Sequence, residues 1–213
     1  MTQVKICGLT TVETLGAALD GGATHVGFVF FAKSPRNIAL EDAARLATVA
    51  RGRAKIVALT VDAEDQVLTS IIARVSPDIF QLHGHELPER TAAIGKRFGR
   101  AVWKAIPVEA AADAARANSY LAAADLILFD AKPPKGAMRT GGNGFAFDWR
   151  ALDDVRGKFP FMLSGGLTPD NVADAIRATS PWGVDVSSGV ESAPGVKDLA
   201  HIRRFLKAVK EAI

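Results

Sequence analysis

Side chains that can exchange protons stand at the ends of short apolar runs in the sequence: the thiol of Cys7, the imidazole of His83 and the carboxyl group of Asp130. Groups of these types act as general acids and bases in enzymes. Each also has a plainer interpretation. A lone cysteine is usually a buried apolar residue, Asp130 could cap the segment that follows it, and His83 could be a hydrogen-bonded structural histidine.

Two glycine-containing turns follow the last two apolar runs, at Gly165-Gly166 and at Ser187-Ser188-Gly189. Without a Cβ atom in the way, backbone N–H groups can approach an anion closely. The glycines could merely turn the chain. Two such turns in succession favour a site for a phosphate group.

The elements that would position these residues are short β-branched or aromatic runs, which alternate with longer amphipathic segments. Strands are predicted at residues 4–7, 25–31, 55–61, 79–82, 101–105, 126–130, 161–164 and 184–187. Helical periodicity is clearest at residues 40–51, 65–75, 169–179 and 196–209. Thr168 and Pro169 suit the start of the third of these helices.

Eight strand-then-helix units favour an α/β fold, a single (βα)8 TIM barrel that occupies residues 1–213 as one domain. Chemistry in such barrels takes place at the carboxyl ends of the strands. This rule points to Cys7, His83, Asp130 and the glycine turns, and also to Asp62 and Lys104.

The composition is that of a water-soluble globular protein, with 48% hydrophobic residues, 23% charged residues and a net charge of +3. No run of Lys or Arg exceeds two residues, so a small anionic substrate is expected rather than nucleic acid. The single cysteine allows neither an internal disulfide nor a cysteine-type metal site. No apolar stretch could cross a membrane and no secretory signal precedes the first strand, so a cytoplasmic protein is expected.

Five segments of the sequence form a more specific pattern. They read Lys-Ile-Cys-Gly at 5–8, Ser-Pro-Arg at 34–36, Gln-Leu-His-Gly at 81–84, Gly-Gly-Asn-Gly at 141–144 and Ser-Gly-Val-Glu at 188–191. In this order they resemble the signatures of phosphoribosylanthranilate isomerases, enzymes of tryptophan biosynthesis. The likeness runs from Val4 to Asp198. The family commonly has Thr or Ser where this chain has Asn143, and a small polar side chain is retained there.

The resemblance implies a cofactor-free Amadori rearrangement, in which an aminoaldose phosphate opens its ribose ring, loses a proton from C2′ and becomes a 1-deoxyribulose. It implies that Cys7 is the general base and Asp130 the general acid. It also implies a phosphorylated small-molecule substrate and no metal. The sequence leaves the oligomeric state open between a monomer and a homodimer. The substrate-binding residues that we expect are Arg36, beside the anthranilate carboxylate, and His83, Gly142, Gly165, Gly166, Asp185, Ser187 and Ser188.

A thiol that acts as a general base needs a neighbouring group that favours the thiolate, because a free thiol with a pKa near 8.5 is mostly protonated at pH 7. Lys5 lies two residues before Cys7, so on a strand the two side chains point to the same side, about 7 Å apart. We expect the charge of Lys5 to favour the thiolate. Asp185 is expected to orient Lys5 or the backbone rather than to transfer protons.

Other phosphosugar barrels are the main alternatives. A ribulose-phosphate epimerase would need metal-binding His and Asp residues at several strand ends, where only His83 is found, and an indole-glycerol-phosphate synthase would need a long N-terminal extension. A non-catalytic phosphate-binding barrel would have no use for Cys7 and Asp130. The basic insert that contains Lys132, Lys135 and Arg139 could attract an anionic substrate or could simply be solvated.

Overall fold

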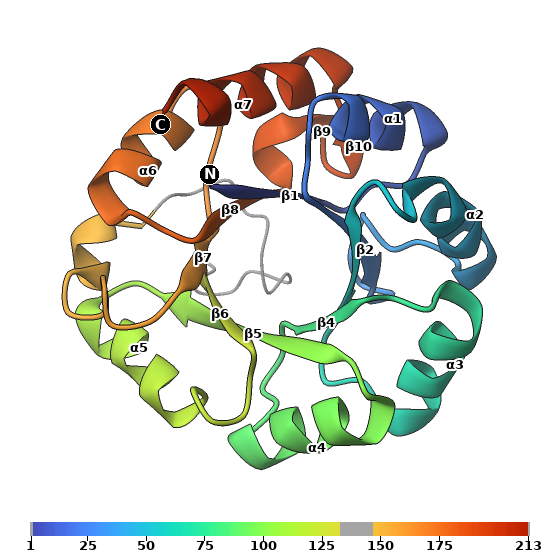
Figure 1. Ribbon diagram of the computed structural model, residues 1–213, viewed down its shortest axis with the longest axis horizontal. Helices are drawn as coiled ribbons and strands as arrows, with labels where there is room; N and C mark the ends of the chain where they lie inside the picture. The colour runs from blue at the N-terminus through green and yellow to red at the C-terminus, as the bar shows by residue number, and fades with distance from the viewer. Residues whose placement is uncertain (1, 133–146, 213) are drawn as a thin grey trace.

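The computed structural model describes residues 2–132 and 147–212. Eight parallel strands pair in chain order, and β8 closes the ring on β1 (Figure 1). The predicted barrel is therefore confirmed. Its strands are β1 (Gln3–Cys7), β2 (His25–Phe30), β3 (Lys55–Thr60), β4 (Ile79–Leu82), β5 (Ala101–Val108), β6 (Leu126–Ala131), β7 (Phe161–Leu163) and β8 (Gly183–Val186).

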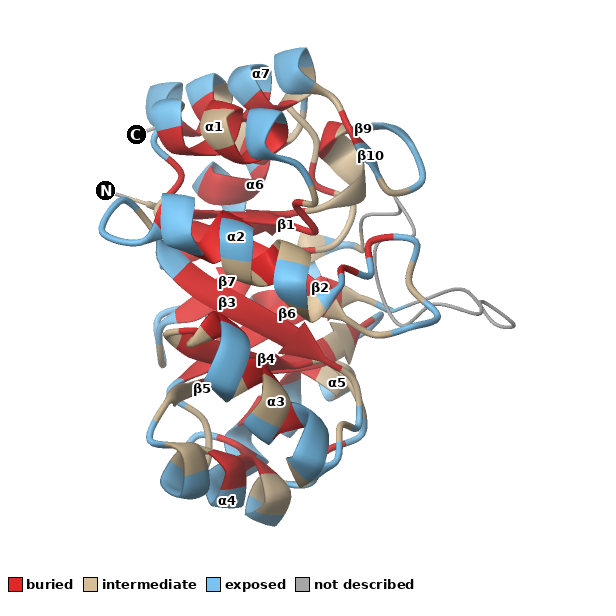
Figure 2. Cartoon of the chain, turned by 90° about the vertical axis from the view of Figure 1, so that its right-hand side faces the viewer, coloured by how far each residue is buried: buried red, intermediate tan, exposed pale blue. Residues whose placement is uncertain are grey.

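Helices surround the barrel and turn their buried faces toward it (Figure 2). The α-helices are α1 (Val12–Asp20), α2 (Leu40–Ala50), α3 (Asp65–Val75), α4 (Pro88–Phe98), α5 (Ala111–Ala115), α6 (Val172–Thr179) and α7 (Leu199–Glu211). Short 3-10 helices are η1 (Arg116–Ser119), η2 (Trp149–Leu152) and η3 (Ser188–Val190). A small hairpin of β9 (Glu191–Ala193) and β10 (Val196–Lys197) stands on the side opposite the chain termini.

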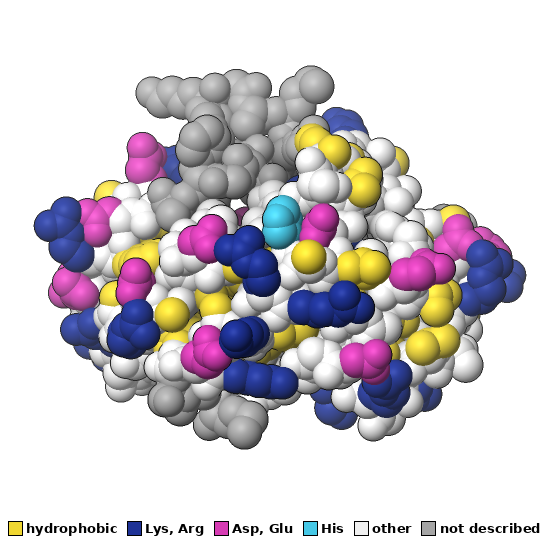
Figure 3. Space-filling view, turned by 90° about the horizontal axis from the view of Figure 1, so that it is seen from above, with side chains coloured by type: hydrophobic (Ala, Val, Ile, Leu, Met, Phe, Trp, Pro, Cys, Tyr) yellow, Lys and Arg dark blue, Asp and Glu magenta, His cyan; other side chains and the backbone are white. Residues whose placement is uncertain are grey.

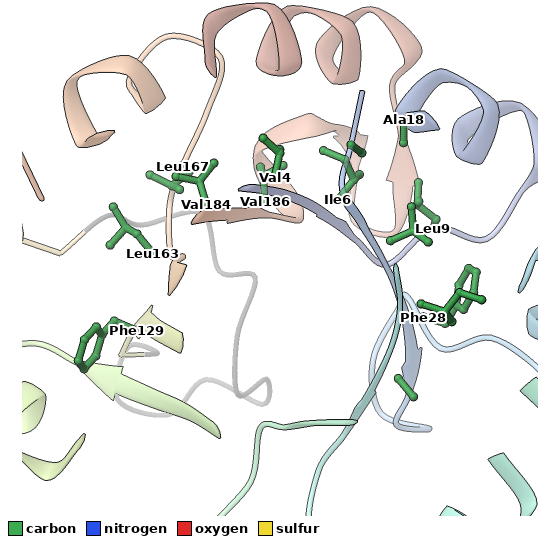
Figure 4. Close-up of a cluster of buried hydrophobic side chains, with 14 of the residues drawn as sticks. Val4, Ile6, Leu9, Ala18, Phe28, Phe129, Leu163, Leu167, Val184 and Val186 are labelled. Carbon is green, nitrogen blue, oxygen red and sulfur yellow. The ribbon is translucent and has the colours of Figure 1, made fainter. Parts of the chain in front are cut away.

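Alternation along the strands divides the apolar side chains into two layers. One set points outward and packs between strands and helices, as Ile6, Phe28 and Leu163 do in Figure 4. The other set fills the barrel interior and includes Val57, Trp103, Leu126, Leu128 and Met162. These side chains pack the barrel interior, and sites in such barrels lie at the carboxyl ends of the strands.

The helix predicted at residues 196–209 is wrong at its start. Gly195 has a φ of 84° and turns the chain, so Val196 and Lys197 form strand β10 instead. Helix α7 begins at Leu199, where the Asp198 carboxylate accepts a hydrogen bond from the backbone of His201 at 2.8 Å. The spacing of Val196 fitted the apolar stripe, but this side chain is 55% exposed.

The predicted start of the helix after β7 is early by about one turn. The N–H of Val172 donates to the carbonyl of Thr168 at 3.1 Å, so the chain does begin to coil at the predicted residue. The regular helix α6 begins only at Val172, with Asn171 at its N-cap. Strand β5 is also longer than predicted, because it continues through Pro107 to Val108.

Charged side chains of both signs are interspersed on the surface shown in Figure 3. Charged side chains of the described residues also form exposed pairs, such as Arg204 with Asp170 and Arg53 with Asp20. Within residues 2–132 and 147–212, no helix has both the length and the apolar character needed to cross a membrane.

Candidate active site

One pocket at the carboxyl ends of the strands brings together the residues selected from the sequence. It is lined by Cys7, Arg36, His83, Asp130, Gly165, Gly166, Asp185, Ser187 and Ser188. Gly142 and Asn143 lie outside the described residues. Apolar side chains complete the wall, among them Val29, Leu59 and Val61.

Cys7 shares its side of the pocket with a buried ion pair. The Lys5 ammonium lies 2.9 Å from the Asp185 carboxylate, and the Lys5 side chain is fully buried. Parallel pairing places residue 5 beside both His25 of β2 and Asp185 of β8. A Cβ on Gly27 would lie 3.0 Å from both the Cys7 Sγ and the Lys5 Cε, so the absence of a side chain at residue 27 leaves room for both groups.

The Lys5 charge acts on the thiol in the expected direction, but burial and Asp185 oppose it. Burial raises the pKa of the Cys7 thiol. The Lys5 cation lowers this pKa and the Asp185 carboxylate raises it, and the net pKa lies above the ordinary value. Burial alone would lower the pKa of Lys5, but Asp185 and then Cys7 raise it above its usual value. The contact with Asp185 thus favours the charged form of Lys5 beside the thiol.

Asp130 is hydrogen-bonded to one side chain and one backbone N–H. Its Oδ2 lies 3.1 Å from the Nε2 of His83, and its Oδ1 accepts from the N–H of Ala131 at 3.0 Å. The Nδ1 of His83 lies 3.2 Å from the amide Nε2 of Gln81. The carboxyl group thus ends a chain of three side chains that begins on β4 and reaches across to β6.

Arg36 is held by a buried carboxylate on the β9–β10 hairpin. Its Nε and Nη2 donate to the two oxygens of Glu191 at 2.7 and 2.8 Å. Lys197 also donates to Glu191, at 2.6 Å, and to the carbonyl of Ser187 at 2.9 Å. Burial alone would raise the pKa of Glu191, but Arg36 and Lys197 hold it below its usual value.

The two glycine turns have no room for side chains. Gly165 has a φ of 85°, and a Cβ there would lie 2.2 Å from the backbone nitrogen of Ala131. A Cβ on Gly189 would lie 1.8 Å from the carbonyl oxygen of Leu167. Asn171 fixes the first turn, because its amide donates to the carbonyl of Gly166 and accepts from the N–H of Thr168. Backbone donors can therefore be brought close to a ligand after β7 and after β8.

Two of the strand-end residues noted in the sequence face elsewhere. Lys104 points outward from β5 and pairs with the buried Glu86 at 2.9 Å. Asp62 pairs with the exposed ring of His85 at 3.0 Å. In the basic insert, Lys132 pairs with Glu109 in an exposed contact, and Lys135 and Arg139 lie outside the described residues.

The family model for N-(5′-phosphoribosyl)anthranilate isomerase matches residues 4–208. The N-(5′-phosphoribosyl)anthranilate isomerase of Mesorhizobium japonicum is 54% identical over 210 residues, which cover 99% of this chain and 96% of that relative. This chain belongs to the phosphoribosylanthranilate isomerase family. The resemblance found in the sequence is confirmed.

Solved isomerase structures share the fold over the whole chain. The crystal structure of the Thermotoga maritima enzyme is 39% identical, covers 99% of this chain and 100% of its own, and gives a TM-score of 0.90. A phosphoribosylanthranilate isomerase in complex with reduced 1-(o-carboxyphenylamino)-1-deoxyribulose 5-phosphate is 37% identical over 99% of this chain and 100% of its own, with a TM-score of 0.87.

Some polar residues of this isomerase-family site were not selected from the sequence. Ser34, Gln81 and Ser164 line the pocket, while Glu191 and Lys197 support it from behind. Gln81 and Glu191 lie within the segments that carried the family resemblance, so the signal was present. Lys197 lies in the last stretch of the likeness as well, but the assignment of its segment to a helix obscured its role.

Proposed function

We propose that this chain converts N-(5′-phosphoribosyl)anthranilate to 1-(o-carboxyphenylamino)-1-deoxyribulose 5-phosphate in tryptophan biosynthesis, with Cys7 as general base and Asp130 as general acid. One observation carries the assignment of roles. Cys7 on β1 and Asp130 on β6 line the same pocket, and the strands between them in the ring, β7 and β8, supply the two glycine turns. A sugar phosphate anchored at these turns has the acid on one side and the base on the other.

The first step in this proposal is ring opening. Asp130 donates a proton to the furanose oxygen, the bond from that oxygen to C1′ breaks, and the nitrogen lone pair forms a C1′–N double bond. The carboxylate left behind keeps its hydrogen bonds to the Ala131 N–H and the His83 ring. Donors that are already in place stabilise the charge as it develops, without reorganisation.

The second step removes the C2′ proton. The Cys7 thiolate takes the proton, and the electrons of the broken bond form the C1′–C2′ double bond of an enolamine as the nitrogen becomes neutral. The positive nitrogen formed by ring opening lies close to the thiol and favours the thiolate at the moment when it is needed. The enolamine becomes the ketone when a proton leaves the C2′ hydroxyl and another is added at C1′.

Substrate binding uses the two ends of the pocket. Gly165, Gly166, Ser187 and Ser188 bind the phosphate through backbone N–H groups. Arg36, whose guanidinium is oriented by Glu191, binds the anthranilate carboxylate. A thiol that must remain reduced also supports a cytoplasmic location.

A fluorescence assay that follows consumption of N-(5′-phosphoribosyl)anthranilate tests the proposal. The purified wild-type protein should turn over, and Cys7→Ala and Asp130→Ala should each lose about 10²- to 10⁴-fold in kcat. Glu41→Gln, an exposed change on α2, is the control and should match the wild type. The absence of turnover by the wild-type protein would reject the activity, and activity retained in either alanine variant would reject that residue's role.

A further inference from the structure

Gln81 is completely buried, yet its side chain makes a single hydrogen bond within the described residues. That bond is the 3.2 Å contact of its Nε2 with the Nδ1 of His83. The other end of the amide, Oε1, is buried without a partner in the same part of the chain. Burying an amide that is only half satisfied costs stability, so an apolar side chain of similar size would suit the fold better. The residue therefore needs a functional explanation.

The direction of the hydrogen bonds follows from the donor at Gln81. When the amide N–H faces Nδ1 of His83, that nitrogen must be an acceptor. A neutral imidazole has one N–H, which must then be on Nε2 and point at the Asp130 oxygen 3.1 Å away. The same amide N–H also opposes a second proton on Nδ1, because two N–H groups would face each other there.

The charge of His83 matters to its neighbour. An imidazolium at this distance would form an ion pair with Asp130 and hold the carboxyl group ionised, which would leave it without a proton to donate. A neutral imidazole still donates a hydrogen bond to the carboxylate formed after proton transfer. The acid therefore functions only if its neighbour stays neutral.

We propose that Gln81 is a positioning residue for the general acid: it holds His83 neutral with its proton on Nε2, so that Asp130 keeps a proton to donate. This role rests on the proposed function. His83 is the direct contact of the acid, and Gln81 acts only through it.

Nitrogen NMR of the protein labelled with 15N-histidine tests the tautomer without substrate. The chain has four histidines, and a His83→Asn sample identifies the signal of residue 83. At pH 7, Nε2 of His83 should carry the proton and Nδ1 should be bare. A proton on Nδ1, or on both nitrogens, would overturn the proposal. Because no turnover is involved, this result stands apart from the activity test.

Two variants of matched size test the consequence for catalysis. In Gln81→Glu, a carboxylate accepts from Nδ1 and favours the imidazolium, so kcat should fall at least tenfold and the alkaline limb of its pH profile should move to lower pH, with a smaller change in KM. Gln81→Met removes the donor but keeps the volume. It should be at least as stable as the wild type in a thermal melt and still lose kcat.

A purely structural residue would behave in the opposite way. Gln81→Met would then lower Tm and leave the kcat profile unmoved, and Gln81→Glu would change neither the tautomer of His83 nor the alkaline limb. Either pattern would reject the role of Gln81. Failure of the wild-type protein to turn over the substrate would instead reject the proposed function.

Discussion

The two sides of the pocket are built differently. On the side of β8 and β1, the Cys7 thiol lies beside a buried ion pair of Lys5 and Asp185. On the side of β4 and β6, Asp130 contacts the ring of His83 and a backbone N–H. The thiol is thus placed near a buried cation, whereas the carboxyl group of Asp130 is placed beside an imidazole ring and a backbone N–H.

The alternation of side chains along β5 maintains this difference between the two sides of the pocket. Lys104 on β5 is adjacent in the sheet to both β4 and β6, but it points outward to Glu86. A shift of one residue along β5 would turn its ammonium into the barrel on the side of the acid. The contrast between the two sides therefore depends on register as well as on residue type.

The largest expected effect comes from changing the base alone. Cys7→Ser keeps the shape of the side chain, but a hydroxyl is not ionised near neutral pH and cannot take the C2′ proton. We expect kcat to fall about a thousandfold, with KM little changed, in steady-state fluorescence assays. Activity within tenfold of the wild type would mean that Cys7 is not the base.

A smaller loss is expected when the charges beside the thiol are removed together. Lys5→Met with Asp185→Asn takes away the cation that lowers the thiol pKa and the weaker anion that raises it, so the pKa of Cys7 should rise further. The rate of alkylation by iodoacetamide as a function of pH reports this pKa cleanly, because the chain has one cysteine. We expect kcat at pH 7 to fall about tenfold for each unit of pKa rise, since the thiolate fraction falls in proportion.

The single variant Lys5→Met is the informative comparison. It leaves the Asp185 carboxylate buried without its partner, which should cost about 3–5 kcal/mol in the free energy of unfolding, whereas the double variant should recover much of this. An unchanged alkylation profile in the double variant would show that the ion pair has no influence on the thiol.

A third variant tests whether charge also organises substrate binding. Glu191→Gln keeps the size of the side chain but removes the anion shared by Arg36 and Lys197. Arg36 should then be held less firmly, and KM should rise about tenfold, which corresponds to about 1.4 kcal/mol, with a smaller change in kcat. Glu41→Gln, which changes the same residue type on an exposed helix face, is the matched control. A fall in kcat with no change in KM would contradict a role in binding.

The smallest effect on turnover is expected at His25, which lies opposite Lys5 on the neighbouring strand β2. Burial, with a further contribution from the Lys5 cation, lowers the pKa of His25 from 6.5 to about 4. The unfolded chain therefore takes up a proton at His25 before the folded protein does, so stability is full above pH 6.5 and falls as pH drops toward 4. The shift of about 2.5 units corresponds to a loss on the order of 3 kcal/mol.

Urea unfolding measured between pH 7 and pH 4 tests this. His25→Gln, which cannot titrate in that range, should lose less stability than the wild type as the pH falls, and its kcat at pH 7 should stay close to that of the wild type. Parallel pH profiles for the two proteins would show that the ring of His25 does not stay neutral in the fold.

The sequence predicted the barrel and much of the pocket lining because both follow from short-range patterns. Strand periodicity and the order of strands and helices determined where Cys7 and the glycine turns would lie. The partners that hold the pocket depend on contacts between distant segments. Lys104 and His83 both stood near strand ends in the sequence, and only the register showed that Lys104 points away. Lys197 was hidden because helical spacing continued backward through a turn that Gly195 makes.

Gly27 places a limit on how this protein can change by mutation. Its missing side chain is the space into which Cys7 and Lys5 project, so any larger residue at this position would displace one or both of them. Substitutions at residues 5, 7 and 27 are therefore expected to be epistatic: alanine at 27 should be better tolerated in a background where residue 5 or 7 has already become smaller. Mutational scans that change one residue at a time will record Gly27 as intolerant, although its backbone geometry would accept a side chain.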